Sequence, residues 1–181
     1  MPFEVLVTIG TMVAVLIGLQ WAFRKMTAPD RATAALQLAK SFCVDVVRHI
    51  GKGELARCSA EQRQIVSAYV FGGIGTFIPM WRLNSAQVSS IVTAVYEDCL
   101  GYSGDESVAR SRAVFLAAED PTSHLNGIIG QGADGFLAWQ KNRKTFEATD
   151  IREAIGRMQG GSQSDFVSAT PNTSLERTRD V

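Results

Sequence analysis

The stretch IVSAYVFGGIGTFI, residues 65–78, constrains the fold more than any other part of the sequence. Its apolar residues fall on nearly every side of a helix, so this segment predicts a helix at the centre of a domain. Ser59 precedes it at the spacing of a capping box, and Pro79 ends or kinks it. The alternative is a membrane span that begins at Ile65 and ends at Trp81. We favour the core helix because 17 residues that include three glycines and a proline are barely long enough to cross a bilayer.

The 3.6-residue period of an α-helix recurs on both sides of this segment, whereas strand-like alternation is hard to find. A second capping box begins at Asn84 and opens the clearest amphipathic stripe in the chain. We therefore expect an all-α domain over residues 27–159, built as a compact bundle of about six helices. The predicted helices cover about residues 29–50, 59–79, 84–101, 105–119, 123–140 and 149–158. Residues 160–181 are rich in Gly, Ser and Thr, a composition that predicts a disordered tail.

An uncharged run precedes the domain: VLVTIGTMVAVLIGLQWAF begins at Val5 and ends at Phe23. With a rise of about 1.5 Å per residue, a helix of this length just crosses a hydrocarbon core about 30 Å thick. The alternative is a cleaved secretory signal, but the start is not basic and no small-x-small cleavage site follows. Residues 1–26 are therefore predicted to be a transmembrane anchor. Arg24 and Lys25 follow the run, which predicts a single-pass protein with its N-terminus outside and its domain in the cytoplasm.

Small residues recur within this run at Gly10, Ala14 and Gly18. Residues four apart share one helix face, and small side chains let two membrane helices approach closely. One hypothesis is therefore a scaffold that forms homodimers through the span. The frequency of Gly and Ala in membrane helices is the ordinary alternative.

Charge and cysteine content narrow the functional classes. The formal net charge is zero, which argues against a nucleic-acid-binding protein, since such proteins are clearly basic. The three cysteines, Cys43, Cys58 and Cys99, match no metal-binding spacing and are odd in number, as expected for reduced thiols in the cytoplasm. We expect no metal and no cofactor.

Glycines are the most unusual local feature. Each glycine inside a helix costs up to about 1 kcal/mol relative to alanine, so a cluster needs a reason. One reading is a close crossing of two helices, and the other is a ligand lying against bare backbone. We favour the crossing because both segments are otherwise apolar. These glycines are Gly72, Gly73 and Gly75 in the second predicted helix and Gly127, Gly130, Gly132 and Gly135 in the fifth.

Several polar and aromatic residues are candidates for a site. In a ligand-binding or enzymatic domain, Tyr69, His124 and Asp134 would supply the polar groups between the glycine-rich helices. Trp81 follows Pro79 near a predicted helix end and is our candidate for a surface contact with a partner, because aromatic residues are common in interface hot spots. Trp139 lies on the apolar stripe of its helix and is predicted to be in the core.

No nucleophile, base or metal set converges in this sequence, so the leading hypothesis is a domain that binds a protein partner without catalysis. The general layout resembles that of small all-α bacterial immunity proteins, which neutralise a toxin by binding it. The layout alone carries this resemblance, without a specific motif, and it makes toxin neutralisation a concrete form of the binding hypothesis.

Overall fold

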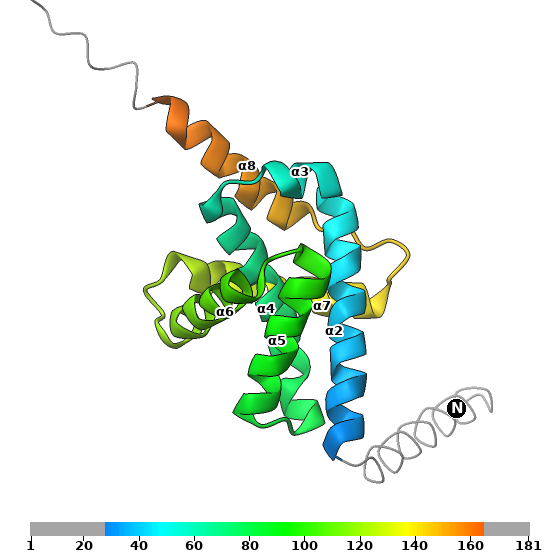
Figure 1. Cartoon of the computed structure of the whole chain (residues 1–181). Helices are drawn as coiled ribbons and strands as arrows, with labels where there is room; N and C mark the ends of the chain where they lie inside the picture. The colour runs from blue at the N-terminus through cyan, green and yellow to red at the C-terminus, as the bar shows by residue number, and fades with distance from the viewer. Residues whose placement is uncertain (1–27, 165–181) are drawn as a thin grey trace, which may run out of the picture.

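The computed structural model describes residues 28–164, which fold into seven α-helices and contain no strand (Figure 1). The predicted all-α class is therefore confirmed. The helices are α2 (Ala28–Ile50), α3 (Lys52–Arg57), α4 (Ala60–Trp81), α5 (Ser85–Leu100), α6 (Gly104–Glu119), α7 (His124–Lys141) and α8 (Thr149–Ser164).

Both predicted capping boxes are present. The Ser59 hydroxyl accepts a hydrogen bond from the backbone N–H of Gln62, and the Gln62 side chain accepts one from the N–H of Ser59. Asn84 and Gln87 make the same reciprocal pair at the start of α5. Each box satisfies backbone donors that a helix N-terminus leaves without partners, which is why these sequence positions locate the helix starts well.

The structure differs from the predicted helix pattern at two places. The predicted first helix ends at about residue 50, where Gly51 and Gly53 act as helix terminators, and no helix is predicted before residue 59. In the structure Gly51 turns the chain with a positive φ of 95° directly into the short α3. Helix α8 continues to Ser164, past the predicted start of the tail at residue 160. The rest of the predicted tail, residues 165–181, lies outside the described residues.

The membrane part of the predicted fold needs correction. None of the helices in residues 28–164 combines the length and apolarity needed to cross a bilayer. The run 5–23, with Gly10, Ala14 and Gly18, lies outside the described residues. Over residues 28–164 the fold is a seven-helix bundle, without the predicted membrane-spanning helix. The single-pass topology, the cytoplasmic location and the dimer through the span have no support in the structure.

Helix α4 is the centre of the bundle, as its sequence predicts. All ten residues from 65 to 74 are buried, so the helix has no solvent-facing side along this stretch. It packs against α2, α5, α6, α7 and α8, and most extensively against α7. Figure 1 shows α4 and α7 behind α5 and α2, which run side by side. This burial confirms the core-helix reading of residues 65–81 over a second span.

Helices α4 and α7 cross with their backbones in contact, and two glycines make this contact possible. A Cβ atom at Gly72 would collide with the carbonyl oxygen of Ile129 on α7. Conversely, a Cβ at Gly132 would collide with the carbonyl oxygen of Tyr69 on α4. The collisions are reciprocal, so each helix supplies one bare backbone position to the other. The predicted close crossing is confirmed.

Two further glycines make room for aromatic side chains around the crossing. Gly73 lies directly under the ring of Phe42 from α2, and Gly135 lies against the hydroxyl of Tyr69. Phe42 also contacts the rings of Phe136 and Trp139, with centroids 5.3 and 5.7 Å away. The glycines therefore explain how three helices meet around one aromatic cluster.

Substitution of Gly72 by alanine should destabilise the fold, because the collision is with backbone that cannot rotate away. We expect Gly72→Ala to lower the free energy of unfolding by about 1–3 kcal/mol or more, measured by urea denaturation. Gly75→Ala is the matched control on the same helix, since a Cβ added there would meet no atom within 4 Å apart from the adjacent backbone of its own helix. It should stabilise by up to about 1 kcal/mol through helix propensity. Equal effects of the two substitutions would contradict the crossing.

Candidate functional site

The space between the glycine-rich helices, proposed above for a ligand, is filled by backbone contact. Tyr69 lies at this crossing, is fully buried, and finds no hydrogen-bond partner for its hydroxyl among the described residues. Burial, and then the negative charges of Asp150 and Asp134, raise the pKa of its phenol. Tyr69 is therefore a neutral core residue with no exposed face to offer a partner.

His124 and Asp134 do not form a common site. Both side chains are exposed, and both belong to α7. Ten residues of helix separate them by about 15 Å along the helix axis. The set of Tyr69, His124 and Asp134 therefore divides into one buried hydroxyl and two separate surface groups, which cannot act together on a small substrate.

The two tryptophan predictions have opposite outcomes. Trp81 was expected at the surface, but it is only 9% exposed and packs in the core at the end of α4. Its position after a proline suggested a loop, whereas α4 continues through Pro79 and carries the ring inward. Trp139 is buried as predicted.

A buried carboxylate that the sequence did not reveal holds Trp139 in place. Asp45 on α2 accepts hydrogen bonds from the Trp139 indole N–H (2.8 Å), from Arg143 Nε (2.9 Å) and from Arg48 (2.6 Å). The Arg143 guanidinium also lies over the Trp139 ring, 4.8 Å from its centroid. Burial raises the pKa of Asp45, but these donors outweigh it and lower the pKa overall. Asp45 is thus an anion that fastens the end of α7 to α2.

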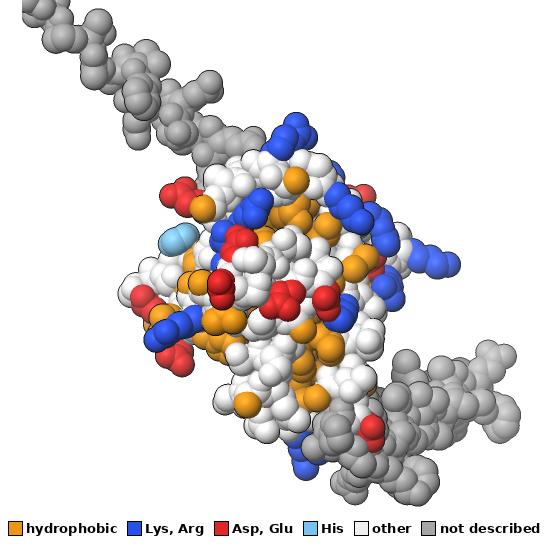
Figure 2. Space-filling view, in the orientation of Figure 1, with side chains coloured by type: hydrophobic (Ala, Val, Ile, Leu, Met, Phe, Trp, Pro, Cys, Tyr) orange, Lys and Arg blue, Asp and Glu red, His pale blue; other side chains and the backbone are white. Residues whose placement is uncertain are grey.

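The clearest surface feature is the outer face of α6, which we define as Asp105, Val108, Arg112, Leu116 and Glu119. At 100° per residue these five positions fall within one face, and all five side chains are exposed. Val108 is 57% and Leu116 60% exposed. Figure 2 shows hydrophobic side chains beside basic and acidic ones on the edge of the molecule where α6 lies. Exposed apolar groups rimmed by charge are typical of protein-binding surfaces.

The charges of this outer face are available to a partner. Among the side chains that the structure describes, Arg112 makes no ion pair, and neither do Asp105 and Glu119. A charge without a partner in the free protein can be paired across an interface without first breaking an internal contact.

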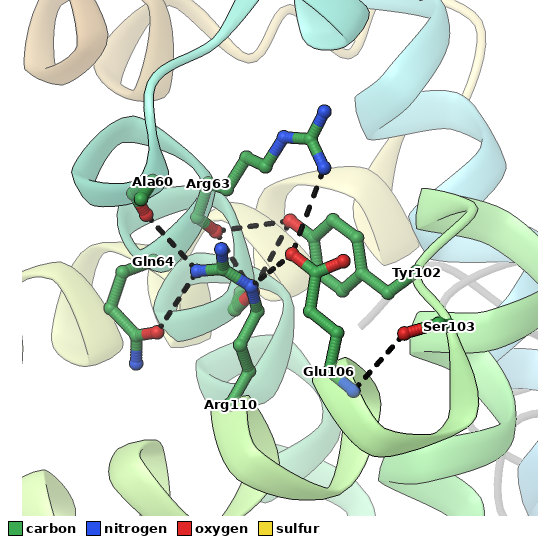
Figure 3. A network of polar contacts seen from close by, with 8 residues as sticks. Ala60, Arg63, Gln64, Tyr102, Ser103, Glu106 and Arg110 are labelled. Atoms are coloured by element: carbon green, nitrogen blue, oxygen red, sulfur yellow. Dashed lines mark hydrogen bonds and ion pairs between the residues drawn. The ribbon is translucent and has the colours of Figure 1, made fainter.

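The inner side of α6 is, in contrast, firmly attached to α4 (Figure 3). Arg110 donates from Nε to Glu106 (2.8 Å), and from its terminal nitrogen to the Ala60 carbonyl (3.0 Å) and the Gln64 side chain (3.2 Å). Arg63 of α4 makes a longer ion pair, 3.6 Å, with the same Glu106 carboxylate. The network links the first turn of α4 to the first two turns of α6.

Tyr102, in the turn between α5 and α6, completes this network. Its hydroxyl donates to the Arg63 carbonyl (3.1 Å), and the guanidinium of Arg110 lies 5.0 Å from its ring centroid. Phe115 on α6 meets Phe71 on α4 edge-to-face, with centroids 4.9 Å apart. Both ends of α6 are therefore held against the core, which fixes the direction in which the outer face points.

Comparison with known protein families identifies the family of this chain. A family model described as Immunity protein 48 matches residues 34–159. The chain belongs to the Immunity protein 48 family. The match begins within α2 and ends within α8, so it covers the bundle that carries the outer face of α6. No curated protein and no solved structure matches the chain significantly.

In this immunity-family bundle, the Asp45 cluster should make stability depend on pH. We expect Asp45→Asn to lower the free energy of unfolding by about 1–3 kcal/mol at neutral pH, because it removes the charge that three donors share. The folded pKa of Asp45 lies below its unfolded value of about 4. Its contribution is therefore complete above about pH 4 and is lost as the pH falls through the folded pKa.

Urea denaturation of wild type and Asp45→Asn across pH checks this prediction. The difference in stability should be constant from about pH 6 to 8 and shrink below about pH 4. Asp98→Asn is the control, since Asp98 is 55% exposed and pairs only with Lys40 at the surface. It should cost less than about 1 kcal/mol. A gap for Asp45→Asn that persists undiminished at about pH 2 would contradict the anionic role of Asp45.

Proposed function

We propose that this protein neutralises a toxin by binding to it, without catalysis, and that the outer face of α6 makes the central contact. Membership of the Immunity protein 48 family supports the functional class. The observation that supports α6 as the toxin contact is its exposed pair Val108 and Leu116, flanked by charges without internal partners.

The structure of α6 suits a binding element. Interfaces derive most of their affinity from a few residues that become desolvated, and Arg is among the commonest of these. The outer face places Arg112 between two exposed aliphatic side chains. The network of Arg110, Glu106 and Tyr102 fixes the backbone before binding. A pre-formed surface loses less conformational entropy on association, so more of the contact energy appears as affinity.

The outer face also defines the chemistry of its partner. A complementary toxin surface would present an apolar depression for Val108 and Leu116, and a carboxylate for Arg112. Basic groups would meet Asp105 and Glu119 at the two ends of α6. The two signs of charge along one helix would fix the orientation of the toxin as well as its affinity.

Protection of growing cells tests the functional class. Bacteria that each express one polymorphic toxin domain would be co-transformed with this protein, and their growth compared with and without it. We expect rescue from one toxin or a few related ones, together with a stable complex on gel filtration. Rescue without any complex would instead indicate that the protein acts on the toxin or its target as an enzyme.

Insertion of a charge into the outer face of α6 tests whether the toxin binds there. Leu116→Asp should weaken toxin binding at least about tenfold, or about 1.4 kcal/mol, because an apolar anchor is replaced by a charge that must be desolvated. The fold should be unaffected, since the side chain is exposed. Isothermal titration of the purified pair gives the affinity, and circular dichroism confirms folding.

Met80→Asp is the matched control. Met80 is 66% exposed, as accessible as Leu116, but it lies at the end of α4. It should bind the toxin with wild-type affinity. If Met80→Asp abolished binding while Leu116→Asp had no effect, the contact would lie elsewhere on the bundle.

A further inference from the structure

Two of the three cysteines, Cys43 and Cys99, meet where α2 packs against α5. Cys43 is completely buried on the inner side of α2, and Cys99 lies partly exposed in the last turn of α5. Each thiol influences the pKa of the other, which places the two side chains close together. Cys99 Sγ also lies 4.0 Å from the carbonyl oxygen of Lys40, one helical turn before Cys43. A pair of thiols therefore bridges two helices that adjoin in Figure 1.

The surroundings of the two thiols give them different reactivity. Interaction with the Cys43 thiol and the charge of the nearby Lys40 ammonium lower the pKa of Cys99, against the opposing effects of burial and Asp98. Burial and the neighbouring Cys99 raise the pKa of Cys43. Lys40 is held beside the pair by its 2.6 Å ion pair with Asp98. A partly exposed thiol of lowered pKa next to a second thiol is the arrangement of redox-sensitive cysteines.

We propose that Cys43 and Cys99 are a redox pair that hydrogen peroxide converts into an intramolecular disulfide between α2 and α5. In the first step the Cys99 thiolate attacks one peroxide oxygen, the O–O bond breaks, and hydroxide leaves with a proton as water. Cys99 becomes a sulfenic acid. In the second step Cys43 sulfur attacks Cys99 sulfur, and the S–O bond breaks as the S–S bond forms. The Cys43 proton leaves with the hydroxide as a second water.

The disulfide would staple together two helices that are distant in sequence. The closed loop contains α3, α4 and nearly all of α5, and cross-links that close long loops restrict the unfolded chain most. Cys58 is a poor competitor, because burial and the charge of Glu54 raise its pKa. The pair lies on helices other than α6, so this inference stands independently of the proposed toxin contact.

Peptide mapping of the full-length protein tests the proposal. After treatment with a small molar excess of hydrogen peroxide, non-reducing mass spectrometry should show one cross-linked peptide pair containing Cys43 and Cys99. The intact mass should fall by about 2 Da, the two hydrogens lost, and a reductant should restore it. The oxidised protein should unfold at a higher temperature than the reduced one.

Three variants assign the roles of the thiols. Cys58→Ser should form the same disulfide as wild type. Cys43→Ala should stop at the sulfenic acid of Cys99, which dimedone traps, and Cys99→Ser should form no intramolecular disulfide. Mapping of the wild type decides the question even if a variant fails to fold. Three unmodified thiols after treatment, a disulfide that includes Cys58, or a Cys99 sulfenic acid that persists beside an intact Cys43 would each overturn the proposal.

Discussion

The backbone contact between α4 and α7 is the constraint on which the rest of the bundle depends. At Gly72 and Gly132 each helix presents bare backbone to a carbonyl oxygen of the other. Two such positions facing each other leave almost no freedom to slide or rotate, because any shift brings a Cβ atom against backbone. The unfavourable helix propensity of glycine is the cost of this fixed geometry, and the buried surface around the crossing offsets it.

Because residues 65–74 of α4 are buried on every side, the helices packed against this stretch surround it and supply most of the surface there. Backbone contacts and buried side chains fill the centre of the described bundle, so the proposed toxin contact lies on the shell. Helix α6 combines the two properties that a recognition element needs. Its inner side is held by an ion-pair network, and its outer side carries apolar groups and charges that nothing in the described chain uses.

Local features of the fold could be predicted from the sequence, and features that depend on distant partners could not. Capping boxes involve residues three apart, and apolar stripes repeat within a turn, so the helix starts and buried faces were correct. The short α3 was missed because Gly51 and Gly53 resemble a terminator. Trp81 was wrongly predicted at the surface, since its burial depends on how other helices pack, which the local sequence does not show. Asp45 was missed because its partners Trp139 and Arg143 lie more than ninety positions away.

The outer face of α6 is visible in the sequence as apolar residues that do not fit a single amphipathic stripe. Val114 and Ala117 are buried while Val108 and Leu116 are exposed, so apolar residues occur on both sides of the helix. Such a helix resembles a weak amphipathic pattern. However, an outer helix that packs on one side can bury only the apolar residues on that side. Apolar residues on its other side must remain exposed. Once the central helix is known, these additional apolar residues on α6 indicate a binding surface, because exposed aliphatic groups rimmed by charge are better explained by a partner than by the fold.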